Sequence, residues 1–316
     1  MASSGERGRR LRRVGAAAVA AVASLSLVAA CSSEDEPATA PPAGGATGEV
    51  TVPISAMTTR LLDPGAEPHA TIEVAPADGT SQRIRMTTES GVHQQIGTQP
   101  TQDFSSPELT LDLDARTHTE PTGGYRVEMT IADTSSPDET LGRALEDAAG
   151  SGAGLTVAPD GSVTALRLRP APDSQDIARS AIEQAFYTAV YRMIAFPAEP
   201  IGVGAQWTIH QNVQSGIALD QTTTATLTAL DGDVATVEFS VDQTPQSPTW
   251  TLPGDGGTLD VDRYVMQGTG TARVDIGSPL PTLLDVSVGG EQSYSDPAGT
   301  TALHQTTTNS VELSEQ

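Results

Sequence analysis

From about residue 50 onward, the chain consists of short runs in which apolar and polar side chains alternate. In LTLDLDARTHT, Leu109, Leu111 and Leu113 are each separated by one polar residue, and GYRVEMTIAD repeats this spacing from residue 124. A period of two is typical of β-strands with one buried and one wet face. The pattern therefore predicts a large antiparallel sheet.

Three Asp-Gly pairs mark tight turns between such runs, at Asp78-Gly79, Asp160-Gly161 and Asp231-Gly232. Asp-Gly favours the two-residue hairpin turn because both central positions take positive φ. At the first pair, Ile72 and Val74 are expected in one strand and Ile84 and Met86 in the next. Three strand-turn-strand units predict a meander.

One stretch follows a helical period instead. After Asp173, a candidate N-cap, apolar residues recur at spacings of three and four until Pro197 ends the pattern: Ile177, Ala181, Ile182, Ala185, Phe186, Ala189, Val190 and Met193. This predicts an amphipathic helix of about 20 residues. A weaker helix is expected over 137–149. The long helix either covers one sheet face or forms a lid over a cavity lined by Ile177, Ile182, Phe186, Val190 and Met193.

The predicted fold class is therefore α+β and mainly β. A large antiparallel meander sheet, curved or half-barrel-like, is packed by one long amphipathic helix, since an antiparallel sheet needs one face covered.

The N-terminus has a different composition. Five arginines lie within the first 13 residues, and residues 14–30 then carry no charge. A basic segment followed by a short apolar one is typical of an export signal. The 17 uncharged residues, many of them alanine, lie at the short limit for spanning a bilayer. The paired arginines keep twin-arginine export open beside the general secretory route.

The only cysteine of the chain follows this apolar run. Val28-Ala29-Ala30-Cys31 resembles the lipobox of bacterial lipoproteins. The resemblance implies that the Cys31 thiol receives a diacylglyceryl group and that a peptidase removes residues 1–30. Two acyl chains anchor a protein stably without a spanning helix. The expected location is the extracytoplasmic face of a cell membrane, with the bilayer as the partner of acylated Cys31.

Residues 31–49 are rich in proline, glycine and acid and contain no aliphatic residue larger than alanine until the run at 50 begins. Such a segment cannot form a core and predicts a disordered tether. Residues 50–316 then form one mainly-β extracytoplasmic domain, or two similar halves split near residue 170.

A second resemblance is carried by FPAEPIGVGAQWTI and GSPLPTLLDVSV together with the lipobox. These phrases resemble an uncharacterised family of actinobacterial lipoproteins, a domain of unknown function. Their residues are those of turns and packing, so the resemblance implies no catalytic residue. The composition, with twelve arginines and no lysine after residue 30, is also typical of a high-GC genome.

Charge and composition exclude several classes. Residues 1–30 carry +4, so the remainder of a chain of net charge −23 carries −27, and nucleic-acid binding needs a basic surface. With Cys31 acylated, no thiol remains for a disulfide, a zinc site or a nucleophile. The absence of lysine removes P-loop, Schiff-base and S-x-x-K chemistry.

Candidate catalytic groups are few. The five histidines lack a metal-ligand spacing, no G-x-S-x-G motif occurs, and no cofactor or metal site is predicted. Asp112 with Asp114, and Asp260 with Asp262, would share a strand face. Such pairs could bind Ca²⁺ or act in a glycosidase, but the wet face of an acidic strand is favoured.

Two functions therefore stay open. The first is a non-enzymatic lipoprotein that binds an apolar or lipid-like ligand beneath the long helix, by analogy with the half-barrel-plus-helix architecture of lipoprotein carriers. The second is a structural or protein-interaction module at the cell envelope, whose partner is another envelope protein or wall polymer. A third possibility, an enzyme, is the least favoured.

Overall fold

The computed structural model describes residues 48–121, 123–252, 257–297, 299 and 301–316. The expected signal peptide, Cys31 and nearly all of the expected tether lie outside these residues. The described elements are β1 (Val50–Pro53), β2 (Thr58–Asp63), β3 (Ser81–Ile96), β4 (Gln102–Asp103), β5 (Ser106–Thr119), β6 (Tyr125–Ser135), α1 (Glu139–Leu145), β7 (Gly152–Val157), β8 (Val163–Arg169), α2 (Asp176–Val190), β9 (Gln206–Ser215), β10 (Ile217–Asp231), β11 (Val234–Pro245), β12 (Thr249–Thr251), β13 (Thr258–Tyr264), β14 (Met266–Asp275), β15 (Leu283–Ser295) and β16 (Ala302–Glu315).

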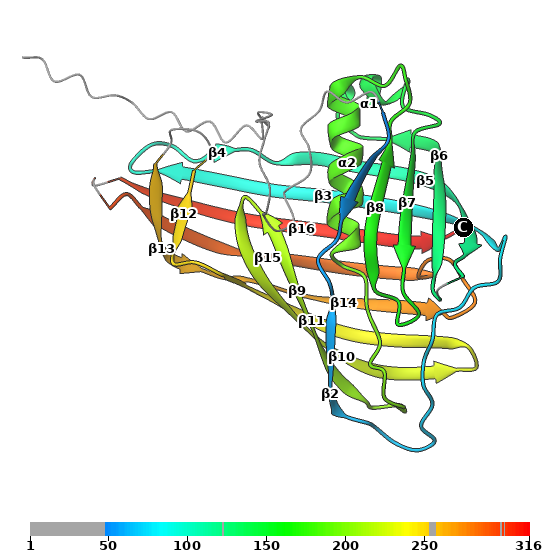
Figure 1. Ribbon diagram of the computed structural model, residues 1–316. Helices are drawn as coiled ribbons and strands as arrows, with labels where there is room; N and C mark the ends of the chain where they lie inside the picture. Colours follow the sequence, from blue (N-terminus) through cyan, green and yellow to red (C-terminus); the bar gives the residue numbers. More distant parts are fainter. Residues whose placement is uncertain (1–47, 122, 253–256, 298, 300) are drawn as a thin grey trace, which may run out of the picture.

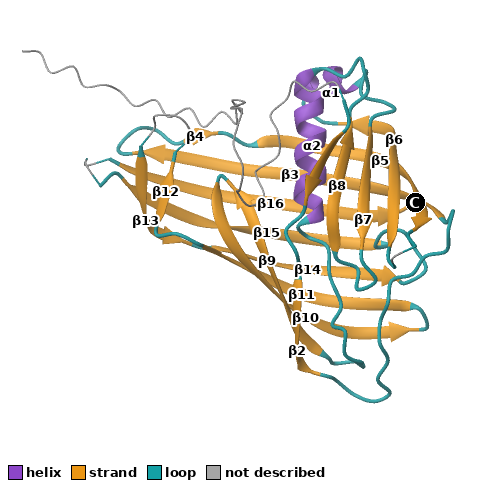
Figure 2. Cartoon of the chain, viewed as in Figure 1, coloured by secondary structure: helices purple, strands orange, loops and turns teal. Residues whose placement is uncertain are grey.

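All described strands belong to one antiparallel sheet that does not close on itself, and the predicted class, α+β and mainly β, is confirmed. Along the sheet the strands lie in the order β1-β8-β7-β6-β5-β3-β16-β15-β14-β11-β10-β9-β2. Figure 2 shows the sheet curving around α2, which is the longer of the two helices in the described residues.

The two strands at the edges of this order are neighbours in sequence. β1 pairs with β8, and β2 pairs with β9 at the opposite edge. Because only residues 54–57 separate them, the sheet must curve until its two edges meet this one segment (Figure 1). Gln211 of β9 donates a hydrogen bond to the Ser55 carbonyl within the connection, at 2.9 Å.

Two of the three predicted hairpins are confirmed. Asp160-Gly161 joins β7 to β8, and Asp231-Gly232 joins β10 to β11. The prediction is wrong for one arm at Asp78-Gly79. Ile72 and Val74 are buried but lie in an irregular segment, and only the following β3 is a strand. There the Val74 amide donates to Pro159 and the Ala75 amide to Ile276, so this segment is held by loops instead of a ladder.

Both predicted helices exist but are shorter than expected. α2 begins after Gln175, not after Asp173, and ends at Val190, before the expected Pro197. The apolar spacing continues past Val190 because Ile194, Ala195 and Phe196 are also buried, in a loop that follows the helix. α1 has a clear start, since the Asp138 side chain accepts hydrogen bonds from the Thr140 and Leu141 amides.

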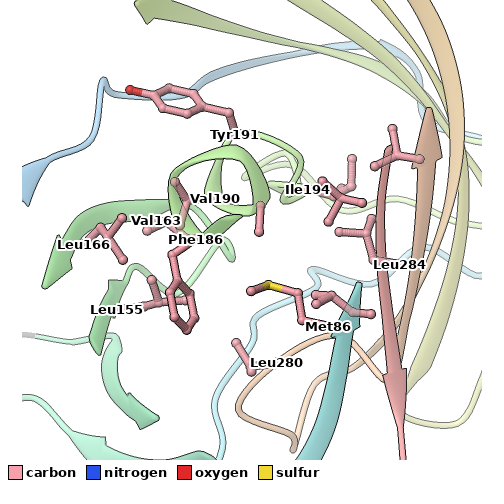
Figure 3. Close-up of a cluster of buried hydrophobic side chains, with 14 of the residues drawn as sticks. Met86, Leu155, Val163, Leu166, Phe186, Val190, Tyr191, Ile194, Leu280 and Leu284 are labelled. Carbon is pink, nitrogen blue, oxygen red and sulfur yellow. The ribbon is translucent and has the colours of Figure 1, made fainter. Parts of the chain in front are cut away.

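The core lies between α2 and the inner face of the sheet. Figure 3 shows Phe186 and Val190 of α2 directed toward Leu155, Val163 and Leu166 of β7 and β8, with Met86 and Leu284 of the opposite sheet wall nearby. Trp207 is fully buried, and its indole N–H donates to the Ala195 carbonyl at 2.9 Å. This bond fixes the loop after α2 against β9. In the described residues, neither helix is long and apolar enough to cross a bilayer.

Candidate functional site

The residues expected to line a cavity beneath α2 do not share one environment. Ile177 is 49% exposed at the start of the helix, whereas Ile182, Phe186 and Val190 are buried in the core. Met193 is partly buried in the loop after the helix. The apolar stripe of the helix is therefore mainly packing surface.

The space beneath the helix is small. An apolar cavity of about 30 Å³ lies under the loop after α2, and among the five expected residues only Met193 lines it, together with Val74, Tyr125, Leu155, Val157, Gly161, Val163, Ile194, Val274, Ser278, Pro279, Leu280 and Pro281. A second one of about 10 Å³ lies beside Ile182. Ligand pockets usually enclose roughly 300–1,000 Å³, so each cavity has room for about one water molecule.

A polar region interrupts the apolar inner face next to this loop. Gln211, Gln221 and Gln243 are opposite one another on β9, β10 and β11. Each is at most 5% exposed. All three occupy inward positions of the alternating pattern, in phase with Trp207 on β9 and with Phe239 on β11. Three buried carboxamides thus form one row across the sheet.

Arg192, in the loop after α2, contacts this row of glutamines. Its guanidinium donates to the Gln221 side-chain oxygen at 2.8 Å, and the residue is only 7% exposed. Burial lowers the pKa of Arg192 to about 10, so the side chain stays protonated at neutral pH. Among the described residues, no carboxylate lies within ion-pair distance of it. The interior therefore holds a positive charge without a counter-ion from the described residues.

The side-chain oxygen of Gln221 is fully engaged by its neighbours. This oxygen accepts from Arg192 and from Gln243, both at 2.8 Å, and the side-chain amide of Gln221 donates to the Tyr191 carbonyl at 3.0 Å. A carboxamide oxygen has two lone pairs, so it can accept no further bond. We call Arg192, Gln211, Gln221 and Gln243 the arginine–glutamine site.

Polar side chains continue along the inner face of the long strands. Gln94 of β3 donates to Gln305 of β16 at 2.9 Å, Gln305 donates to Thr307, and Thr307 donates to Gln292 of β15. Nearby, Ser90 donates to Asn309 at 2.8 Å. These strands extend well past α2 (Figure 1). The inner face is therefore apolar around the helix and rich in carboxamides and hydroxyls beyond it.

The two acidic pairs lie apart from this site. Asp112 forms an ion pair with Arg85 at 2.8 Å, and Asp114 forms one with Arg83 at 3.1 Å. The hydrogen bond from Arg85 lowers the pKa of Asp112. Asp262 accepts a bond from Ser295. Across the described parts of the chain, no group of three or more His, Cys, Asp or Glu residues is placed to hold a metal ion.

No protein-family model, curated protein or solved structure matches the chain.

Proposed function

We propose that this chain is a lipid-anchored, non-enzymatic binding protein on the extracytoplasmic face of a cell membrane. The anchor is Cys31, supported by the basic segment, the apolar run and the lipobox-like Val28-Ala29-Ala30-Cys31. Its ligand is apolar or lipid-like and is bound inside the curved sheet. The resemblance to actinobacterial lipoproteins of unknown function supports the location.

The observation that carries the binding function is Arg192. Burying an ionised group costs several kcal/mol unless it is paired, yet this guanidinium is 7% exposed with Gln221 as its side-chain partner. A domain that only needed a core would place an apolar residue there. An interior group that is costly to the fold and suited to recognition supports a ligand site.

The sizes of the cavities restrict how such a ligand binds. The apolar space of about 30 Å³ under Met193 and Ile194 cannot hold an acyl chain. A lipid-like ligand bound beneath the helix therefore requires the loop after α2 to separate from the sheet. Arg192, Met193 and Ile194 are consecutive in that loop, so one movement would expose both the charge and the apolar cavity.

The positions of the acidic side chains favour a binding function over catalysis. Asp112 and Asp114 are each held by an arginine on the outer face, and the arginine–glutamine site contains no acid or histidine. General acid–base chemistry needs a titratable group near neutral pH beside the substrate. Carboxamides and an arginine can orient a ligand but cannot exchange its protons.

Native mass spectrometry tests the binding function. Full-length protein is released from membranes in mild detergent, and its mass is compared before and after solvent extraction. We expect an adduct that extraction removes and that a denatured and refolded sample lacks. Absence of an adduct, with no thermal stabilisation by any lipid added back, would contradict ligand binding.

The anchor is tested separately with Cys31→Ser. Loss of the thiol removes the acceptor for the diacylglyceryl group, so the variant should no longer incorporate a radiolabelled fatty acid and should retain its signal peptide. The wild-type chain should incorporate the label and sediment with membranes. Equal labelling of both chains would refute the anchor and leave the ligand question open.

The alternative, a structural or protein-interaction module, is favoured by the outer face of the sheet. In register across β10, β11, β14, β15 and β16, this face presents a row of hydroxyl side chains: Thr224, Ser240, Thr269, Ser287 and Ser310. In-cell cross-linking followed by purification should recover a defined envelope partner if this alternative holds. Recovery of the chain alone would count against it.

A further inference from the structure

We infer that Arg192 binds an oxyanion, the carboxylate or phosphate group of an amphipathic ligand, inside the curved sheet. This inference rests on the proposed binding function and names the chemical class of its ligand. It is carried by the geometry of the arginine–glutamine site.

Arg192 differs from the other buried arginine of the described chain. Arg179 is equally buried, at 7% exposure, and its Nε is buried without a hydrogen-bond partner among the described residues. Its guanidinium, however, lies 3.5 Å from the Asp176 carboxylate and donates to the Ser174 carbonyl. Arg192 has a single side-chain hydrogen bond to the described residues. A guanidinium carries five N–H donors in a planar fork, so most of its donor capacity is available.

The surrounding groups cannot neutralise this charge. Gln221 and Gln243 are neutral, and the Gln221 oxygen already has two donors. Three acids of β10 and β11 lie on the opposite face of the sheet and are exposed: Asp220, Glu238 and Asp242. A guanidinium fork matches the two oxygens of a carboxylate or phosphate, so an incoming oxyanion would supply both the missing charge and the missing acceptors.

The neighbouring side chains indicate that the rest of the ligand is apolar. On the inner face, Ile209 and Val213 flank Gln211, and Leu219 precedes Gln221; all are at most 6% exposed. Tyr187 and Tyr191 pack edge to face at 4.9 Å, and the Tyr191 carbonyl is bonded to Gln221. An oxyanion held at Arg192 would lie among hydrocarbon and aromatic groups, as suits an amphiphile.

Arg192→Met tests the site in the full-length chain. Titrations compare oleate, a lysophosphatidic acid, uncharged monoolein and inorganic phosphate in the same nonionic detergent. We expect the two anionic amphiphiles to bind the wild type, and Arg192→Met to weaken them about 10- to 100-fold, as expected for loss of a charged hydrogen bond. Arg192→Lys keeps the charge without the planar fork, so its affinity should lie between those of the wild type and Arg192→Met. Arg179→Met, the matched buried arginine, should leave affinity unchanged.

Thermal unfolding without added ligand distinguishes recognition from a structural role. Removing a buried charge that has no carboxylate partner among the described residues should leave the melting temperature of Arg192→Met unchanged or raised. Arg179→Met should lower the melting temperature, because the buried Ser174 carbonyl loses its hydrogen bond from the guanidinium. A lower melting temperature for Arg192→Met with unchanged affinities would overturn the inference.

The four probe ligands distinguish between an amphiphile and a free solute as the source of the oxyanion. If inorganic phosphate binds the wild type and Arg192→Met loses this binding, the oxyanion site belongs to a free solute. This result would overturn the inference that its ligand is an amphiphile. If the wild type binds monoolein as tightly as oleate, and Arg192→Met binds both equally, the oxyanion site is refuted while the proposed function stands. If no probe binds and no adduct co-purifies, the proposed function itself fails.

Discussion

Gly290 in β15 shows how closely the strands approach at single residues. A Cβ atom at this position would lie 1.9 Å from the Val265 carbonyl oxygen, which is backbone and cannot turn aside. Gly290→Ala should therefore lower the free energy of unfolding by about 1–3 kcal/mol, the usual cost of overpacking. Urea unfolding of the purified variant measures this value.

Gly142→Ala in α1 is the matched control. Its added Cβ would meet the Ser136 carbonyl at 3.6 Å, an ordinary contact, and alanine is the better helix former by about 0.5–1 kcal/mol. The variant should be neutral or stabilised. Equal destabilisation by both substitutions would show that the close approach to the Val265 carbonyl is not the cause of the effect at Gly290.

The sequence indicates part of the arginine–glutamine site but not which of its residues lie together. Gln211, Gln221 and Gln243 stand at positions where the period of two places an apolar side chain. Which glutamines face each other depends on strand register, and the position of Arg192 depends on where α2 ends. Local propensity determines neither the register nor the end of the helix. The residues predicted to line a cavity therefore included Met193 but not its neighbour Arg192.

At the scale of an element, the two helices begin in different ways. Asp138 caps α1 by accepting from the amides of Thr140 and Leu141, at 3.0 and 2.8 Å. Gln175 precedes α2 without a side-chain capping bond. Asp138→Ala should therefore destabilise the domain by about 0.5–2 kcal/mol, whereas Gln175→Ser should stabilise it by up to about 1 kcal/mol. Paired urea titrations test both signs.

A stabilising Asp138→Ala, or a Gln175→Ser that destabilises, would contradict this account of the helix starts. For Gln175→Ser the circular dichroism at 222 nm serves as a control, since a new cap should leave the helix content unchanged or slightly raised.

Element types were easier to predict than element ends. The Asp-Gly turns at 160 and 231 carry their own conformational signal, and both give hairpins. The run at Ile72 and Val74 has the burial of a strand but no ladder, because its backbone amides bond to loop carbonyls at Pro159 and Ile276. The end of α2 was missed for a similar reason, since a buried loop continues the helical apolar spacing.

For the whole molecule, the first and last parts of the domain are joined along two long strands. β3 pairs with β16 from Ile84 to Ile96, and Gln82 and Leu280 exchange two hydrogen bonds, at 3.2 and 3.0 Å. β1 and β2 connect the opposite edges. Two similar halves split near residue 170 would therefore be joined by two strand pairings, β3 with β16 and β2 with β9.

A cooperative unfolding transition is the expected consequence. Both tryptophans, Trp207 and Trp250, lie after residue 170, so their fluorescence reports on the second part of the chain. Met129 in β6 is 3% exposed in the first part, and Met129→Ala should remove about 2–5 kcal/mol. The urea midpoint of tryptophan fluorescence should fall by the same amount as that of far-ultraviolet circular dichroism. Thr130→Ala, its exposed neighbour, should move neither. Two separate transitions, with the tryptophan signal unaffected by Met129→Ala, would instead establish two independent halves.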